Sequence, residues 1–97
     1  MKEKDITAAI MRYLKIVPDC FVFKTHGGMY GTAGLPDIIC CVGGRFVGSE
    51  VKTPDGKLSA LQKVTLQKIN AAGGTAVKVE SVDAVKEIIN EIGGTRL

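Results

Sequence analysis

The charged residues Asp37, Glu50 and Lys52 interrupt the most apolar stretch of the sequence, "GLPDIICCVGGRFVGSEVK" at residues 34–52. Gly43 and Gly44 have the conformational freedom that a tight hairpin turn requires. Antiparallel pairing around this turn places Asp37 directly opposite Glu50, with both side chains on one face of the sheet. Lys52, two residues after Glu50, points to the same face. The hairpin therefore predicts two carboxylates and one ammonium group in a single patch.

Such a patch has the composition of a metal-dependent phosphodiesterase site. Two adjacent carboxylates repel each other unless a proton, a cation or Lys52 neutralises them. Mg²⁺ prefers oxygen ligands and commonly takes one or two carboxylates, which leaves positions for water and for a substrate phosphate. A metal lowers the pKa of its bound water, and a neighbouring ammonium can orient that water and offset charge on the attacked phosphate. The alternative interpretation is a structural ion pair of Lys52 at the end of a strand.

Two residues on predicted helices could extend this patch. Glu3 falls within the apolar stripe of the first helix, and Gln62 lies on the sheet-facing arc of the second. Each also has a purely structural interpretation. Glu3 would suit the first turn of a helix, where a negative charge interacts favourably with the helix dipole. Gln62 would complete a capping box with Ser59.

Hydrophobic periodicity and turn residues predict seven elements in the order αβββαβα. The two halves of the hairpin are the second and third strands, and a glycine-rich loop precedes them. We expect a loose end at "GGTRL", residues 93–97. The predicted helices span residues 6–15, 60–72 and from 81 or 83 onward, and the predicted strands span 20–24, 37–42, 45–52 and 75–79.

Length and composition fit one domain, residues 1–97, because 45% of the residues are hydrophobic and 24% are charged. Three cysteines, two of them adjacent, provide no disulfide framework and favour a reducing, intracellular setting. Cys40 and Cys41 would face opposite sides of a strand, which disfavours a shared zinc ion. No segment is long and apolar enough to be a membrane span. The net charge of +3 is compatible with a nucleic-acid partner without demanding one.

The segments "GLPD" and "EVK", separated by twelve residues, resemble the two signature segments of the PD-(D/E)XK nuclease superfamily. The acidic residue in the first helix, the glycine-rich approach to "GLPD" and the "LSALQ" segment resemble its VRR-Nuc branch. The resemblance implies an α/β fold with a restriction-endonuclease-like αβββαβ core, in which helices flank a mixed sheet. It also implies roles for individual residues. Asp37 and Glu50 would bind Mg²⁺ or Mn²⁺ with the Val51 carbonyl, Lys52 would activate water, Glu3 would complete the acidic cluster, and Gln62 would support the site.

The same resemblance implies a DNA endonuclease, acting as a homodimer on branched DNA such as four-way junctions, in the cytoplasm of a bacterial or phage-infected cell. Lys24, His26 and Tyr30 in or beside the glycine-rich loop, and Lys57 and Lys63 at the second helix, are candidate DNA contacts. Ordinary solvent-exposed residues are the alternative for all five. The loop lacks the known phosphate-binding patterns, so we expect no nucleotide cofactor. Two alternative functions are a non-catalytic DNA-binding module and a nuclease that acts on RNA.

Overall fold

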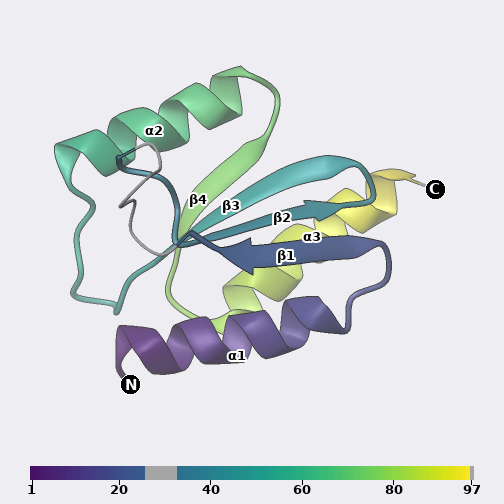
Figure 1. Ribbon diagram of the computed structural model, residues 1–97, viewed down its shortest axis with the longest axis horizontal. Helices are drawn as coiled ribbons and strands as arrows, with labels where there is room; N and C mark the ends of the chain where they lie inside the picture. The colour runs from purple at the N-terminus through teal and green to yellow at the C-terminus, as the bar shows by residue number, and fades with distance from the viewer. Residues whose placement is uncertain (26–32, 97) are drawn as a thin grey trace.

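The computed structural model describes residues 1–25 and 33–96 of the 97-residue chain. The seven elements follow one another in the predicted order αβββαβα (Figure 1). The helices are α1 (Glu3–Lys15), α2 (Ala60–Ala71) and α3 (Val82–Arg96), and the strands are β1 (Cys20–Lys24), β2 (Ile38–Val42), β3 (Arg45–Val51) and β4 (Thr75–Val79).

The four strands form one mixed sheet in the order β1-β2-β3-β4, which confirms the predicted architecture. The first three strands are antiparallel neighbours, whereas β4 runs parallel to β3 and is reached through α2. Gly43 and Gly44 form the β2–β3 turn with φ angles of 56° and 83°, a region that glycine enters without steric cost. The pairing of Val42 with Arg45 and of Ile38 with Ser49 is the predicted register.

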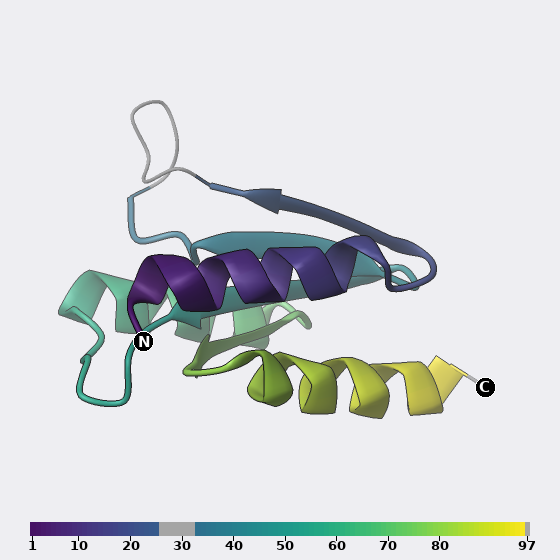
Figure 2. The same cartoon turned by 90° about the horizontal axis from the view of Figure 1, so that it is seen from below.

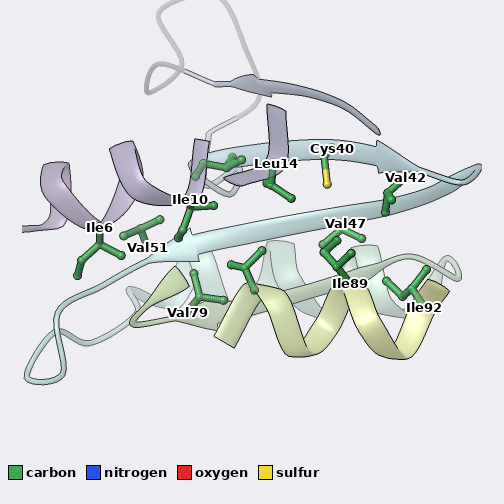
Figure 3. Packing of buried hydrophobic residues seen from close by; sticks show 12 residues of the cluster. Ile6, Ile10, Leu14, Cys40, Val42, Val47, Val51, Val79, Ile89 and Ile92 are labelled. Carbon is green, nitrogen blue, oxygen red and sulfur yellow. The ribbon is translucent and has the colours of Figure 1, made fainter. Parts of the chain in front are cut away.

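The hydrophobic core lies between the sheet and the two helices α1 and α3 (Figures 1 and 2). Ile6, Ile10 and Leu14 recur along α1 at four-residue intervals, so one stripe of this helix is buried. Figure 3 shows Ile6 and Ile10 beside Val51, while Ile89 of α3 lies beside Val47. The other face of the sheet carries α2, which packs mainly against β4.

The first helix begins at Glu3, ahead of the apolar stripe that starts at Ile6. The prediction differs from the structure at the end of the last helix. The last helix continues to Arg96, so the expected loose end is wrong for residues 93–96. Two glycines weaken a helix by roughly 1 kcal/mol each. The buried contacts of Val85, Ile89 and Ile92 hold α3 against the core, and tertiary packing of this kind overrides local propensity.

Within the described parts of the chain, none of the helices has the length and apolar character needed to cross a membrane.

Candidate active site

Asp37 is held in place by the ends of three strands. Its side-chain Oδ2 accepts a hydrogen bond of 2.8 Å from the backbone N–H of Val51. Its carbonyl oxygen accepts a bond of 3.0 Å from the backbone N–H of Thr25, just beyond β1. The hydroxyl of Thr25 also donates to the carbonyl of Pro36 at 2.8 Å. The chain around Asp37 is therefore fixed from both neighbouring strands.

Glu50 lies beside Asp37 and is almost completely buried, with 2% of its surface exposed. Its Oε2 accepts a hydrogen bond of 3.1 Å from Nε2 of Gln62 and lies 3.9 Å from Nζ of Lys52. Its Oε1 is different: among the fully buried side-chain oxygen and nitrogen atoms of the described residues, it alone has no hydrogen-bond partner. A buried carboxylate oxygen without a partner is costly and calls for a positive group that completes the site.

The surroundings of Glu50 disfavour its negative charge. Burial is the largest effect, the charge of the neighbouring Asp37 carboxylate is the next, and a hydrogen bond that the protonated Glu50 side chain shares with Asp37 is the third; together they raise the pKa of Glu50 from 4.5 to about 7. Lys52 opposes this change, and Glu3 adds a smaller repulsion. A carboxyl group with a pKa near neutrality, next to a second carboxylate and an ammonium, is typical of catalytic and metal-binding sites.

Gln62 has both of the roles that the sequence left open. Its Oε1 accepts from the backbone N–H of Ser59 at 2.8 Å, and its own backbone N–H donates to Oγ of Ser59 at 3.1 Å. These two bonds form the capping box at the start of α2. At the same time its Nε2 donates to Glu50. One amide thus links the start of α2 to the buried carboxylate on β3.

The β2–β3 ladder stops short of the two carboxylates. Its last pair is Ile38 with Ser49, one step before Asp37 and Glu50. The predicted pair of Asp37 with Glu50 therefore lies one step beyond the last ladder pair, at the position to which the same register extends, and there the Asp37 side chain accepts the Val51 N–H. The structure nevertheless brings Asp37, Glu50 and Lys52 together. The charge of Asp37 raises the pKa of Glu50, and the charge of Lys52 lowers it.

Glu3 does not join the two carboxylates as a third ligand. It is exposed at the first position of α1. Across residues 1–25 and 33–96, no three His, Cys, Asp or Glu residues lie close enough to hold one metal ion. Glu3 reaches Glu50 only through its charge, because a side chain at the helix start lies ahead of the buried stripe. A direct metal-binding role for Glu3 is not supported by this geometry.

The structure assigns no role to the remaining predicted residues that it describes. Val51 is buried in β3, and a ligand role for its carbonyl stays a prediction. Three of them are exposed lysines. Lys24 is the last residue of β1, Lys57 precedes α2, and Lys63 is in α2. His26 and Tyr30 lie outside the described residues.

Sequence reasoning missed two residues that position Asp37. Thr25 binds the Pro36–Asp37 segment through its backbone N–H and through its hydroxyl, which lies within hydrogen-bond distance of both carbonyl oxygens. Gly48 makes room for Pro36, since a Cβ atom at Gly48 would lie 2.8 Å from Cγ of that proline. A glycine inside an apolar strand is a known sign of close packing, so Gly48 carried a signal that could have been followed. Thr25 carried no such signal.

No protein-family model matches the sequence, and no curated protein matches it. Solved structures do. One described as "VRR_NUC domain" superimposes with a TM-score of 0.77 and 21% identity, covering 93% of this chain and 96% of that one. Another, described as "VRR_NUC domain protein", gives a TM-score of 0.76 and 20% identity, covering 93% and 86%. The chain therefore has the fold of VRR_NUC domains, the fold that its sequence motifs predicted.

Proposed function

We propose that this protein is a metal-dependent endonuclease that hydrolyses DNA phosphodiester bonds. The observation that carries the proposal is Oε1 of Glu50, a buried carboxylate oxygen with no hydrogen-bond partner, beside a second carboxylate and a lysine. The ion pair with Lys52 engages Oε2 and leaves Oε1 without a partner, a position that a divalent cation between Glu50 and Asp37 would fill. The likeness to VRR_NUC domains supports the same chemistry on the same fold.

The donor set fits Mg²⁺ or Mn²⁺. Asp37 and Glu50 offer oxygen ligands, which these cations prefer over nitrogen or sulfur. The described residues provide no third acidic, histidine or cysteine ligand, a partial set that suits a cation which keeps several waters and a substrate phosphate. A bound divalent cation would neutralise the two carboxylates, polarise the phosphate and lower the pKa of its bound water.

The protein's own side chains prepare this chemistry. The Val51 N–H fixes the Asp37 carboxylate, and Gln62 fixes Oε2 of Glu50. Lys52, with its side chain 16% exposed, can reach both Glu50 and a substrate phosphate at the rim of the site. Its ammonium would orient the attacking water and stabilise the negative charge that develops on the phosphate. Burial of Glu50 excludes water from one side of the site.

The proposal extends to branched DNA and to a homodimer. One domain with one such site cuts one strand. A net charge of +3 provides only weak electrostatic attraction to a DNA duplex. Two copies related by a two-fold axis would place two sites symmetrically, which suits a four-way junction. Exposed Lys24, Lys57 and Lys63 are the candidate phosphate contacts.

Cleavage of labelled linear, flapped and four-way-junction DNA with Mg²⁺, Mn²⁺ or EDTA tests the proposal. We expect cleavage with either cation, none with EDTA, and faster cleavage of the junction. Metal-independent DNA binding without any cleavage would instead identify a non-catalytic DNA-binding module. Cleavage of RNA in preference to DNA would contradict the substrate class.

A further inference from the structure

All three phenylalanines of the chain are exposed, with 70%, 45% and 41% of Phe21, Phe23 and Phe46 accessible. The buried core of the described residues contains none of the aromatic types and is built from isoleucine, valine, leucine, alanine and cysteine, with Pro36 beside it. The chain thus fills its interior with aliphatic side chains and presents its phenylalanines to solvent. A cluster of large exposed aromatic rings marks a binding surface.

The three rings lie on one face of the sheet. Phe21 pairs with Cys41, which pairs with Phe46, and directly opposed residues share a face. Phe23, two residues after Phe21, points to the same side, and the two ring centres are 6.0 Å apart. This is the face that carries Glu50, because Glu50 is four positions after Phe46 on β3 and every second residue of a strand points to the same face.

On this face Phe21, Phe23 and Cys41 are exposed, whereas Ile39, which lies between Phe23 and Gly48, is buried. The helix α2 on the same side packs mainly against β4. At the boundary, an apolar pocket of about 230 Å³ adjoins the ring of Phe46 and is lined also by Ile69, Ala72 and Gly74. The row of rings along β1 continues to Thr25, whose N–H bonds to the carbonyl of Asp37. The aromatic surface is therefore continuous with the candidate active site.

We infer that Phe21, Phe23 and Phe46 form a stacking platform for unpaired bases of a DNA strand that enters the site. The inference rests on the proposed function in taking DNA as the ligand. Alternate residues of a strand are about 6.6 Å apart, roughly twice the 3.4 Å rise of duplex DNA, so unstacked successive bases can meet successive rings. Aromatic platforms of this kind bind single strands without reading sequence.

The platform itself is uncharged. Strand alternation directs Lys24 and Arg45, the exposed sequence neighbours of Phe23 and Phe46, to the other face of the sheet, so their long side chains could meet a phosphate only at the rim of the platform. The strands β1, β2 and β3 contain no exposed acidic residue. A second copy of the chain could also cover an apolar face, and exposed Leu61 and Val64 on α2 would add to such an interface. The choice of aromatic rings and their continuity with Asp37 favour bases over a protein partner.

Binding measured in EDTA, where no cleavage is expected, tests the platform. Fluorescence anisotropy of a short labelled single strand should show that Phe21→Ala and Phe23→Ala each weaken binding about 10- to 100-fold. Phe21→Leu and Phe23→Leu keep an apolar surface but lose the ring, and should weaken binding nearly as much. Ile16→Ala is the matched control, because Ile16 is 80% exposed in the turn after α1, away from the platform. It should leave binding unchanged.

A second probe needs no variant. The wild-type protein should bind a strand with abasic positions about as weakly as the Phe→Ala variants bind the normal strand. Equal affinity for normal and abasic strands would overturn the inference. Full affinity in the leucine variants would also overturn it. If the alanine variants keep their DNA affinity but sediment with a lower mass than the wild type, the phenylalanines form an interface between copies of the chain instead. Single-strand binding that depends on the phenylalanines, without any Mg²⁺-dependent cleavage, would contradict the proposed function and still support the platform.

Discussion

Gln62 donates a hydrogen bond of 3.1 Å from Nε2 to Oε2 of Glu50 while its Oε1 caps α2 through the Ser59 N–H. The position of the buried Glu50 carboxylate is therefore tied to the start of α2. Because both ends of one amide are used, replacing it can separate helix stability from site function.

Gln62→Glu should preserve the cap and damage the site. A glutamate oxygen can still accept from Ser59, since glutamate serves equally well at this position of a capping box. The same change removes the donor to Glu50 and places a negative charge against it. We expect cleavage to fall by orders of magnitude while the melting temperature, measured at pH 5, changes little.

Ser59→Ala is the matched control for that variant. It removes the hydroxyl that accepts from the Gln62 backbone N–H and leaves the Gln62 amide in place. It should cost about 1 kcal/mol of stability and leave the cleavage rate of the folded protein unchanged. Unchanged cleavage in Gln62→Glu would assign Gln62 to the cap alone.

Substitutions of the two carboxylates and of the lysine should have different effects on metal binding. Asp37→Asn and Glu50→Gln should abolish cleavage and weaken Mn²⁺ binding measured by calorimetry, because each removes a proposed ligand. Lys52→Ala should abolish cleavage and leave Mn²⁺ affinity nearly intact, since its ammonium acts on water and phosphate. Full cleavage by any of the three would contradict the assigned roles.

Stability without metal should fall as pH rises from about 5 to 8. The folded-state pKa of Glu50 is raised from 4.5 to about 7, so the folded protein holds this proton more tightly than the unfolded chain does. The resulting stabilisation is complete below pH 4.5 and is lost as pH rises through 7. Its size is on the order of 2–3 kcal/mol.

Urea unfolding in EDTA across this pH range measures the effect. Glu50→Gln should remove most of the pH dependence and be more stable than the wild type at pH 8, because its side chain carries no charge to bury. Mg²⁺ should stabilise the wild type at pH 8 and have little effect on the variant. A wild-type stability that rises between pH 5 and 8 would contradict the buried, protonated state of Glu50.

Local rules were sufficient to predict the scaffold. Gly43 and Gly44 determine a two-residue turn, and a two-residue turn fixes the register of every pair down the hairpin. The same register brought Asp37 and Glu50 to one end of the sheet. The spacing of apolar residues predicted the helices because each packs one stripe on the sheet.

Features that depend on tertiary contacts could not be predicted in this way. Thr25 is separated from Asp37 by twelve residues, and only the paired sheet brings them together. The ladder ends one step before Asp37 and Glu50, where the Asp37 side chain competes with the backbone for the Val51 N–H. The continuation of α3 past Gly93 depends on packing elsewhere along the helix.

Gly48→Ala should weaken metal binding without touching a ligand. The added Cβ would lie 2.8 Å from Cγ of Pro36, so the proline and the adjoining Asp37 must shift. Overpacking of this kind costs about 1–3 kcal/mol. We expect lower stability and, in fully folded protein at low temperature, a reduced Mn²⁺ affinity.

Val85→Ala provides the comparison, because Val85 is fully buried in α3. It should lower stability by about 2 kcal/mol, through loss of buried surface, and leave the Mn²⁺ affinity of the folded protein unchanged. If both variants lose stability and neither loses metal affinity, Gly48 has only a packing role.

The homodimer predicts paired cuts on a symmetric substrate. Two copies double the net charge from +3 to +6 and with it the number of available phosphate contacts, so junction binding should weaken more steeply with salt than binding by a single copy. Analytical ultracentrifugation at micromolar concentration should give twice the mass of one chain. Mixing wild type with an excess of Lys52→Ala should replace most paired cuts by nicks on one strand, because most wild-type chains are then in mixed dimers with one competent site. A monomeric mass, together with undiminished cutting of linear duplex, would contradict the dimer and describe a simple nickase.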